Sequence, residues 1–124
     1  MEKKIVVVID DETDLLKVTL LRLNMSGYAA FGTADGQSGL ELARQKMPDL
    51  IVLDVLLPDM NGDEVAKILK KDEKLKRIPI ILISAEIETL ETRARESGVE
   101  GYLSKPFESK ELLGMIKKHL SATL

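Results

Sequence analysis

The sequence predicts an α/β fold in which helices cover both faces of an open, mainly parallel β-sheet. Three runs are almost entirely apolar and rich in isoleucine and valine, at residues 4–10, 49–55 and 78–84. Continuous apolar runs of this length are typical of parallel strands that are buried on both faces. Segments with the helical spacing of apolar residues separate these runs, and this alternation of strand and helix predicts the parallel sheet.

Five strands and five helices are predicted, in strict alternation. Besides the three strong strands, the weaker segments 28–33 and 101–104 complete the sheet. The predicted helices follow the strands in chain order and span residues 12–25, 35–46, 62–71, 86–97 and 109–121.

Each predicted helix carries apolar residues three or four positions apart, which places them on one face. Ser26-Gly27, Pro48 and Gly98 follow the first, second and fourth helices and are good stop signals. The apolar stripe of 86–97 is narrow, so we expect a helix of low stability. The stripes are Leu16, Leu20 and Leu23; Leu40, Ala43 and Met47; Val65, Ile68 and Leu69; Ile87, Leu90 and Ala94; and Leu113, Ile116 and Leu120.

Length and composition predict one globular domain over residues 1–124. No apolar run approaches the roughly 20 residues of a membrane helix, so no membrane partner is expected. The net charge is −3, aromatic residues make up 3% of the chain, and the basic stretch 69–78 is interrupted by Asp72 and Glu73. These features give no reason to expect nucleic-acid binding. The chain has no cysteine and no signal-peptide pattern before its first strand, so we expect a cytoplasmic protein.

Polar residues occur at the end of four of the five predicted strands. Asp10 and Asp11 follow the first strand, Asp54 the third, Ser84 the fourth and Lys105 the fifth. The carboxyl ends of parallel strands meet at one edge of the sheet, where ligands of such folds bind. Each residue alone has a simpler explanation, since aspartate is common as a helix cap or turn residue. Their combined placement favours a site.

The predicted cluster of acids requires positive charge nearby. Two carboxylates about 4 Å apart repel by roughly 1 kcal/mol in water and by about 4 kcal/mol at an effective dielectric constant of about 20. One lysine does not neutralise three carboxylates, whereas Mg²⁺ prefers oxygen ligands and suits such a set. A metal among carboxylates, with a lysine and a hydroxyl opposite, is suited to phosphoryl transfer onto a carboxylate.

Other sites known from this fold class do not match the residues. The chain has no GxGxxG or Walker A loop that would bind a nucleotide. A flavodoxin-type loop accepts a phosphate after the first strand, where Asp10 and Asp11 would repel it. Phosphatases with an Asp-x-Asp pair require a second acid after Asp54, and Val55 and Leu56 stand there instead.

Four segments in order, "VIDDE", "LIVLDVLLPDMNG", "IILISA" and "GYLSKPF", make the chain similar to the receiver domain of two-component response regulators. The similarity covers essentially the whole chain, and the segments together are highly specific. It implies a flavodoxin-like, doubly wound (βα)5 sandwich with five parallel strands in the order 2-1-3-4-5.

The resemblance also implies a role for each polar residue. Asp54 would be the phospho-accepting nucleophile, and Lys105 would pair with a phosphoryl oxygen. The implied Mg²⁺ ligands are the carboxylates of Asp11 and Asp54, the backbone carbonyl of Leu56, and Asp10 acting through water.

Two further residues would act as a switch. Ser84 would hydrogen-bond the phosphoryl group, and Tyr102 would turn inward when Ser84 moves. The Lys105–Pro106 bond is typically cis in this family. The chain departs from the family pattern slightly, at Asn61, where aspartate is more usual, and at Glu108, where a shorter polar cap is commoner.

The resemblance implies a signalling switch that is phosphorylated by a sensor histidine kinase and changes the surface formed by residues 86–120. That surface would contact a downstream effector, and it could also form a homodimer. The protein would catalyse only its own phosphorylation and dephosphorylation. His119 is the only histidine and is expected on the surface, so the chain would be the acceptor and not the donor. A receiver-like interaction module that is never phosphorylated, and a Mg²⁺-dependent phosphatase, are the alternatives.

Overall fold

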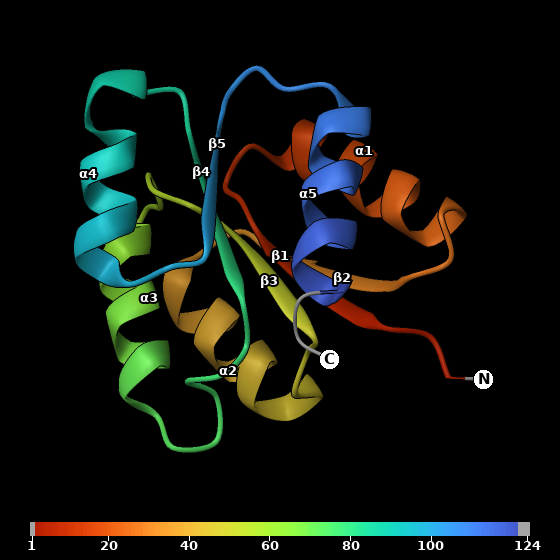
Figure 1. Cartoon of the computed structure of the whole chain (residues 1–124), viewed down its shortest axis with the longest axis horizontal. Helices are drawn as coiled ribbons and strands as arrows, with labels where there is room; N and C mark the ends of the chain where they lie inside the picture. The colour runs from red at the N-terminus through yellow and green to blue at the C-terminus, as the bar shows by residue number, and fades with distance from the viewer. Residues whose placement is uncertain (1, 122–124) are drawn as a thin grey trace.

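The computed structural model describes residues 2–121 and has five strands and five helices in strict alternation (Figure 1). The five strands form one parallel sheet in the order β2-β1-β3-β4-β5, as the resemblance implies. The elements are β1 (Ile5–Ile9), α1 (Thr13–Met25), β2 (Ala29–Thr33), α2 (Gly36–Lys46), β3 (Leu50–Asp54), α3 (Gly62–Lys71), β4 (Ile80–Ser84), α4 (Ile87–Ser97), β5 (Gly101–Ser104) and α5 (Ser109–Ser121).

The predicted ranges agree with the structure to within two residues at every end. Three predicted helices begin one residue early, because they include the N-cap residues Glu12, Asp35 and Glu86. Of the three caps, Asp35 accepts a hydrogen bond from a backbone N–H of its own helix, that of Ser38 (2.8 Å). A cap residue lies outside the helical backbone conformation, so these three helices begin one residue later than predicted.

Two apolar layers hold the helices on the sheet, one on each face. Successive residues of a strand point to opposite faces. Val7 and Ile9 therefore face α2, α3 and α4, whereas Val6 and Val8 face α1 and α5. Figure 1 shows the same division, with α1 and α5 on one side of the sheet and the other three helices on the opposite side. β1, β3 and β4 are consequently buried on both faces.

The predicted apolar faces of the helices agree with the structure in general, but some of the residues assigned to them are exposed. Ile68 and Ile87 are 39% and 65% exposed, respectively. In α3 the small side chain of Ala66 faces the sheet, so the buried face runs through Val65, Ala66 and Leu69, and Ile68 turns outward. His119 is half-buried and not on the open surface as expected, because its ring packs beside Gly101 of β5.

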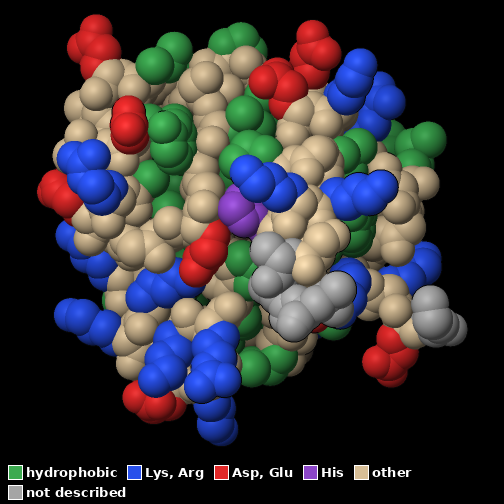
Figure 2. Space-filling model, viewed as in Figure 1, with side chains coloured by type: hydrophobic (Ala, Val, Ile, Leu, Met, Phe, Trp, Pro, Cys, Tyr) green, Lys and Arg blue, Asp and Glu red, His purple; other side chains and the backbone are tan. Residues whose placement is uncertain are grey.

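Figure 2 shows the face formed by α4, β5 and α5. Lysine and arginine side chains gather at its lower left, near the connection between α3 and β4, and acidic side chains lie among them.

Within the described residues, no helix is long and apolar enough to span a membrane.

Candidate functional site

Strand register brings the predicted polar residues to one edge of the sheet. Ile9 of β1 is paired with Leu53 of β3, so Asp10 and Asp54 are the next residues of adjacent strands. Asp54 is in turn paired with Ile83, one residue before Ser84. Because Ser84 pairs with Ser104, Lys105 leaves the fifth strand at the same edge.

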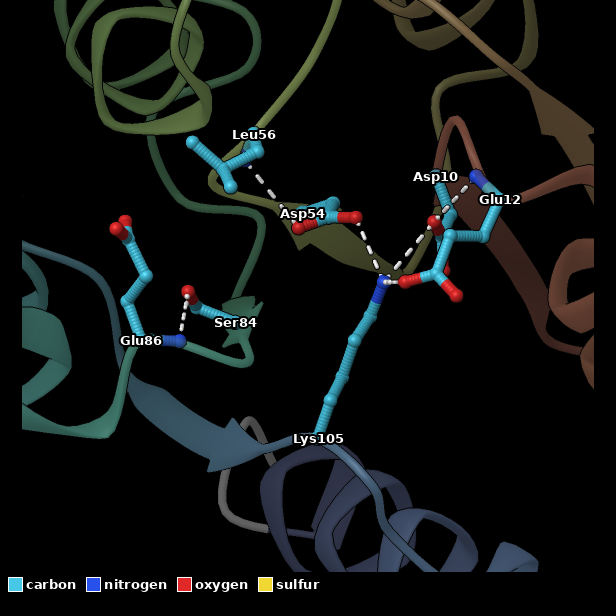
Figure 3. A network of polar contacts seen from close by, with 7 residues as sticks. All are labelled: Asp10, Glu12, Asp54, Leu56, Ser84, Glu86 and Lys105. Carbon is cyan, nitrogen blue, oxygen red and sulfur yellow. Dashed lines mark hydrogen bonds and ion pairs between the residues drawn. The ribbon is translucent and has the colours of Figure 1, made fainter.

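Lys105 is the centre of the site. Its side chain extends from the end of β5 toward the ends of β3 and β1 (Figure 3). The ammonium Nζ lies 2.7 Å from Asp54 Oδ2, 2.7 Å from Glu12 Oε1 and 3.1 Å from Asp10 Oδ1. Asp10, Asp54 and Lys105 are buried, with 1%, 4% and 8% exposure. A single cation therefore bridges three carboxylates in a site that is largely closed to water.

Glu12 is the site residue that the sequence reasoning missed. Its backbone N–H donates to Asp10 Oδ1 at 3.0 Å, and this short turn directs the Glu12 side chain back to Lys105. The signal was present in "VIDDE", where the glutamate stands two residues after Asp10. Asp11 lies between them, is exposed, and makes no ion pair with Lys105 in the described structure. Direct metal ligation by Asp11 remains a prediction.

Burial and neighbouring charges shift the pKa values of the central pair. Burial raises the pKa of Asp54 to about 6, and the nearby Asp10 carboxylate also raises it, while the Lys105 hydrogen bond opposes both effects. Burial by itself would lower the pKa of Lys105. The hydrogen bonds to Asp54 and Glu12 and the charges of Asp54 and Asp10 outweigh burial, so the pKa of Lys105 lies above its ordinary value. Lys105 is thus a permanent cation, and Asp54 is mostly ionised at neutral pH.

The acidic group fits a hard divalent cation. Asp10, Glu12 and Asp54 each offer one carboxylate oxygen, and these three oxygens lie within 4.8 Å of one another. With all three ionised, the charges of −3 from the carboxylates and +1 from Lys105 leave −2. An all-oxygen donor set with a double negative charge suits Mg²⁺. The cluster could therefore bind a metal ion.

The loop after β3 is held in one shape by short contacts. The N–H of Leu56 donates to Asp54 Oδ1 (3.3 Å), and the N–H of Gly62 donates to the carbonyl of Val55 (2.7 Å). Leu56 and Asn61 also form an isolated bridge. A Cβ atom on Gly62 would overlap the carbonyl oxygen of Asp54, so this position requires glycine. The side chain of Leu56 is 50% exposed, and it lies near Asp54 in Figure 3.

Asp59 anchors the same loop to α2. Its two carboxylate oxygens accept the N–H groups of Gly36 (2.8 Å) and Gln37 (2.9 Å) at the start of that helix. Hydrogen bonds from Gln37 and Gly36 hold the pKa of Asp59 below its usual range. The helix N-terminus also carries a partial positive charge that favours a carboxylate.

The two predicted switch residues differ in exposure. Ser84 is buried, and its Oγ accepts the N–H of Glu86 at 2.9 Å (Figure 3). Tyr102 is 43% exposed on β5. The Lys105–Pro106 bond is cis, as the resemblance implies.

A cavity of about 400 Å³ opens beside Lys105. Apart from the two charged residues, its walls are apolar. It is lined by Glu12, Leu15, Ala85, Lys105, Pro106 and Phe107. The cavity gives a bound molecule a route from solvent toward the site at the edge of the sheet.

Comparison with known proteins agrees with this geometry. The response regulator receiver domain family matches residues 6–117. The polar-differentiation response regulator DivK of Brucella ovis is 40% identical over 123 residues, covering 97% of this chain and 98% of DivK. The chemotaxis response regulator CheY4 of Vibrio cholerae has 28% identity and a TM-score of 0.89, over 95% of this chain and 99% of that one.

A crystal structure from Chloroflexus aurantiacus, assigned as a response regulator, has a TM-score of 0.91 and 29% identity, covering 97% of this chain and 99% of that chain. The fold and the acidic site together define a doubly wound α/β domain with a cluster of acids and one lysine at the carboxyl edge of its parallel sheet. The chain belongs to the response regulator receiver domain family of two-component signalling.

Proposed function

We propose that this protein is a phosphorylation-activated switch that accepts a phosphoryl group on Asp54 from the phosphohistidine of a sensor kinase. The observation that carries the proposal is the buried Asp54 carboxylate at the end of β3, within 2.7 Å of the Lys105 ammonium. A buried carboxylate with a raised pKa beside a fixed cation is a common arrangement in reactive sites.

The reaction joins an Asp54 carboxylate oxygen to phosphorus. The P–N bond of the phosphohistidine breaks, and the imidazole leaves with its electron pair. Lys105 pairs with a phosphoryl oxygen and offsets the added negative charge. The Ser84 hydroxyl donates a hydrogen bond to a second oxygen. The protein thus catalyses only its own phosphorylation and the later hydrolysis of the acyl phosphate.

Mg²⁺ would be held by Asp11 and Asp54 together with the backbone carbonyl of Leu56, and Asp10 would act through water. When bound, it neutralises charge on the phosphoryl oxygens. The support for a metal at this site is the cluster of carboxylate oxygens and the double negative charge that remains beside Lys105.

The added charge would move the segment that follows Ser84. The Ser84 Oγ leaves the N–H of Glu86 when it turns to the phosphoryl group, and residues 85–89 are all exposed. α4, which buries Leu90, Ala94 and Ser97, begins within this exposed segment and is therefore the element that would move with it. Tyr102, half-exposed at rest, would turn inward, and the surface of residues 86–120 would then bind an effector or a second copy.

The kinase would dock beside the acceptor. α1 begins directly after Glu12 and exposes three large apolar side chains: Val18, Leu21 and Met25, at 49%, 59% and 73%. A group of exposed apolar side chains on one element is typical of a protein contact surface. A cytoplasmic kinase domain that presents its histidine to the cavity beside Lys105 would cover this part of α1.

The test is incubation with a small phosphodonor such as acetyl phosphate, with and without Mg²⁺, followed by intact-protein mass spectrometry. Wild type should gain one phosphoryl adduct that requires Mg²⁺, and Asp54→Asn should gain none. The same adduct on both proteins would show that Asp54 is not the acceptor.

The two alternative functions give different results in this experiment. An interaction module that is never phosphorylated would gain no adduct under any condition. A phosphatase would turn over a phosphomonoester continuously, and this turnover would survive Asp54→Asn.

A further inference from the structure

The three carboxylates around Lys105 are not equivalent. The side chains of Asp10 and Asp54 are 2% and 5% exposed, whereas that of Glu12 is 60% exposed. Even so, Glu12 makes a contact with Lys105 that is as short as the contact of Asp54, 2.7 Å in each case. Glu12 therefore binds the ammonium from the solvent side of an otherwise buried site.

The backbone of Glu12 is fixed, and its side chain is the part that can move. The Glu12 N–H is bonded to Asp10, and its carbonyl accepts the N–H of Leu16 in the first turn of α1. A carboxylate that is more than half exposed is well solvated when it leaves its partner, so its release costs little. The same release at Asp10 or Asp54 would leave a buried, unpaired charge.

We infer that Glu12 is a positioning residue that holds Lys105 at rest and competes with the phosphorylated Asp54 for the ammonium. This inference rests on the proposed function. Lys105 must leave Glu12, at least in part, to pair fully with a phosphoryl oxygen. Glu12 thereby weakens the activated state, and it lowers the fraction of protein that responds to a given phosphodonor.

The resting contact is tested first without metal or phosphodonor. In the metal-free protein, the ammonium protons of Lys105 should be protected from exchange and visible by ¹H–¹⁵N NMR. Glu12→Gln should speed their exchange, because one of three acceptors loses its charge. The control is Asp14→Asn, which removes an exposed carboxylate from the same helix start and which has no ion pair with Lys105. It should leave the signal unchanged.

The competition is tested with beryllofluoride, which mimics the phosphoryl group, at saturating Mg²⁺. The affinity of the wild type is compared with those of three variants by NMR titration. Glu12→Gln should bind beryllofluoride about threefold more tightly, as expected for the loss of one partly exposed ion pair. Glu12→Asp keeps the charge but is one methylene too short for the contact, so it should resemble Glu12→Gln. Asp14→Asn should resemble wild type.

These results distinguish a direct ion pair between Glu12 and Lys105 from an effect of the Glu12 charge at a distance. Unchanged affinity in Glu12→Gln would overturn the inference, and so would an equal gain in Asp14→Asn. Wild-type behaviour of Glu12→Asp would show that the charge acts at a distance, which also overturns it. If wild type binds no beryllofluoride and gains no phosphoryl adduct, the proposed function fails. The exchange measurement still decides whether Glu12 holds Lys105.

Discussion

Replacement of Asp54 by asparagine should make the stability of this protein depend less on pH. The pKa of Asp54 is raised from 3.8 to about 6 in the folded protein, chiefly by burial. The folded state therefore binds this proton more tightly than the unfolded chain. The stability that the folded protein gains from protonated Asp54 is fully present below pH 3.8 and is lost as the pH rises through about 6. The two pKa values correspond to a free-energy difference of about 3 kcal/mol.

The expected result is a difference in the free energy of unfolding between the two proteins that increases with pH. The free energy of unfolding of Asp54→Asn minus that of wild type should rise by up to about 3 kcal/mol between about pH 4 and pH 7. Lys105 titrates outside this range, since its pKa is raised, so it adds no slope. The assay is urea unfolding in metal-free buffer, followed by circular dichroism at several pH values. A difference that is constant or falls with pH would refute the reasoning, and Asp14→Asn is the matched control.

Three further changes test the loop after β3 and the central lysine. Gly62→Ala should destabilise the protein by about 1–3 kcal/mol in thermal unfolding, because the new Cβ overlaps the Asp54 carbonyl. The control is Gly114→Ala, which should be neutral or stabilising because the space around Gly114 is open. Asp59→Asn should destabilise at neutral pH and flatten acid unfolding, because the pKa of Asp59 is lowered and its contribution is lost only as the pH falls through that value. Equal pH profiles for Asp59→Asn and wild type would contradict this. Lys105→Ala should keep Mg²⁺ binding, measured by titration, and weaken the chemical-shift response to beryllofluoride; an unchanged response would remove Lys105 from the mechanism.

The sequence was sufficient to predict most of the fold, because its apolar pattern is regular. Continuous runs such as Ile5–Ile9 are typical of strands that are covered on both faces. Errors arose where one side chain could lie on either edge of a helix face. Ile68 and Ala66 are both near the buried face of α3, and close packing on the sheet selected the smaller residue.

The sequence by itself also determined which strand ends carry the acids and the lysine, since parallel strands must end at the same edge. It did not determine that two of the three consecutive acids, Asp10 and Glu12, contact Lys105 and that Asp11 does not. That choice depends on the turn between β1 and α1, where Asp10 accepts the Glu12 N–H and the Glu12 side chain returns over the site. Asp11 is left exposed. A contact between residues 93 positions apart, such as that of Glu12 with Lys105, exists only once the whole sheet is assembled.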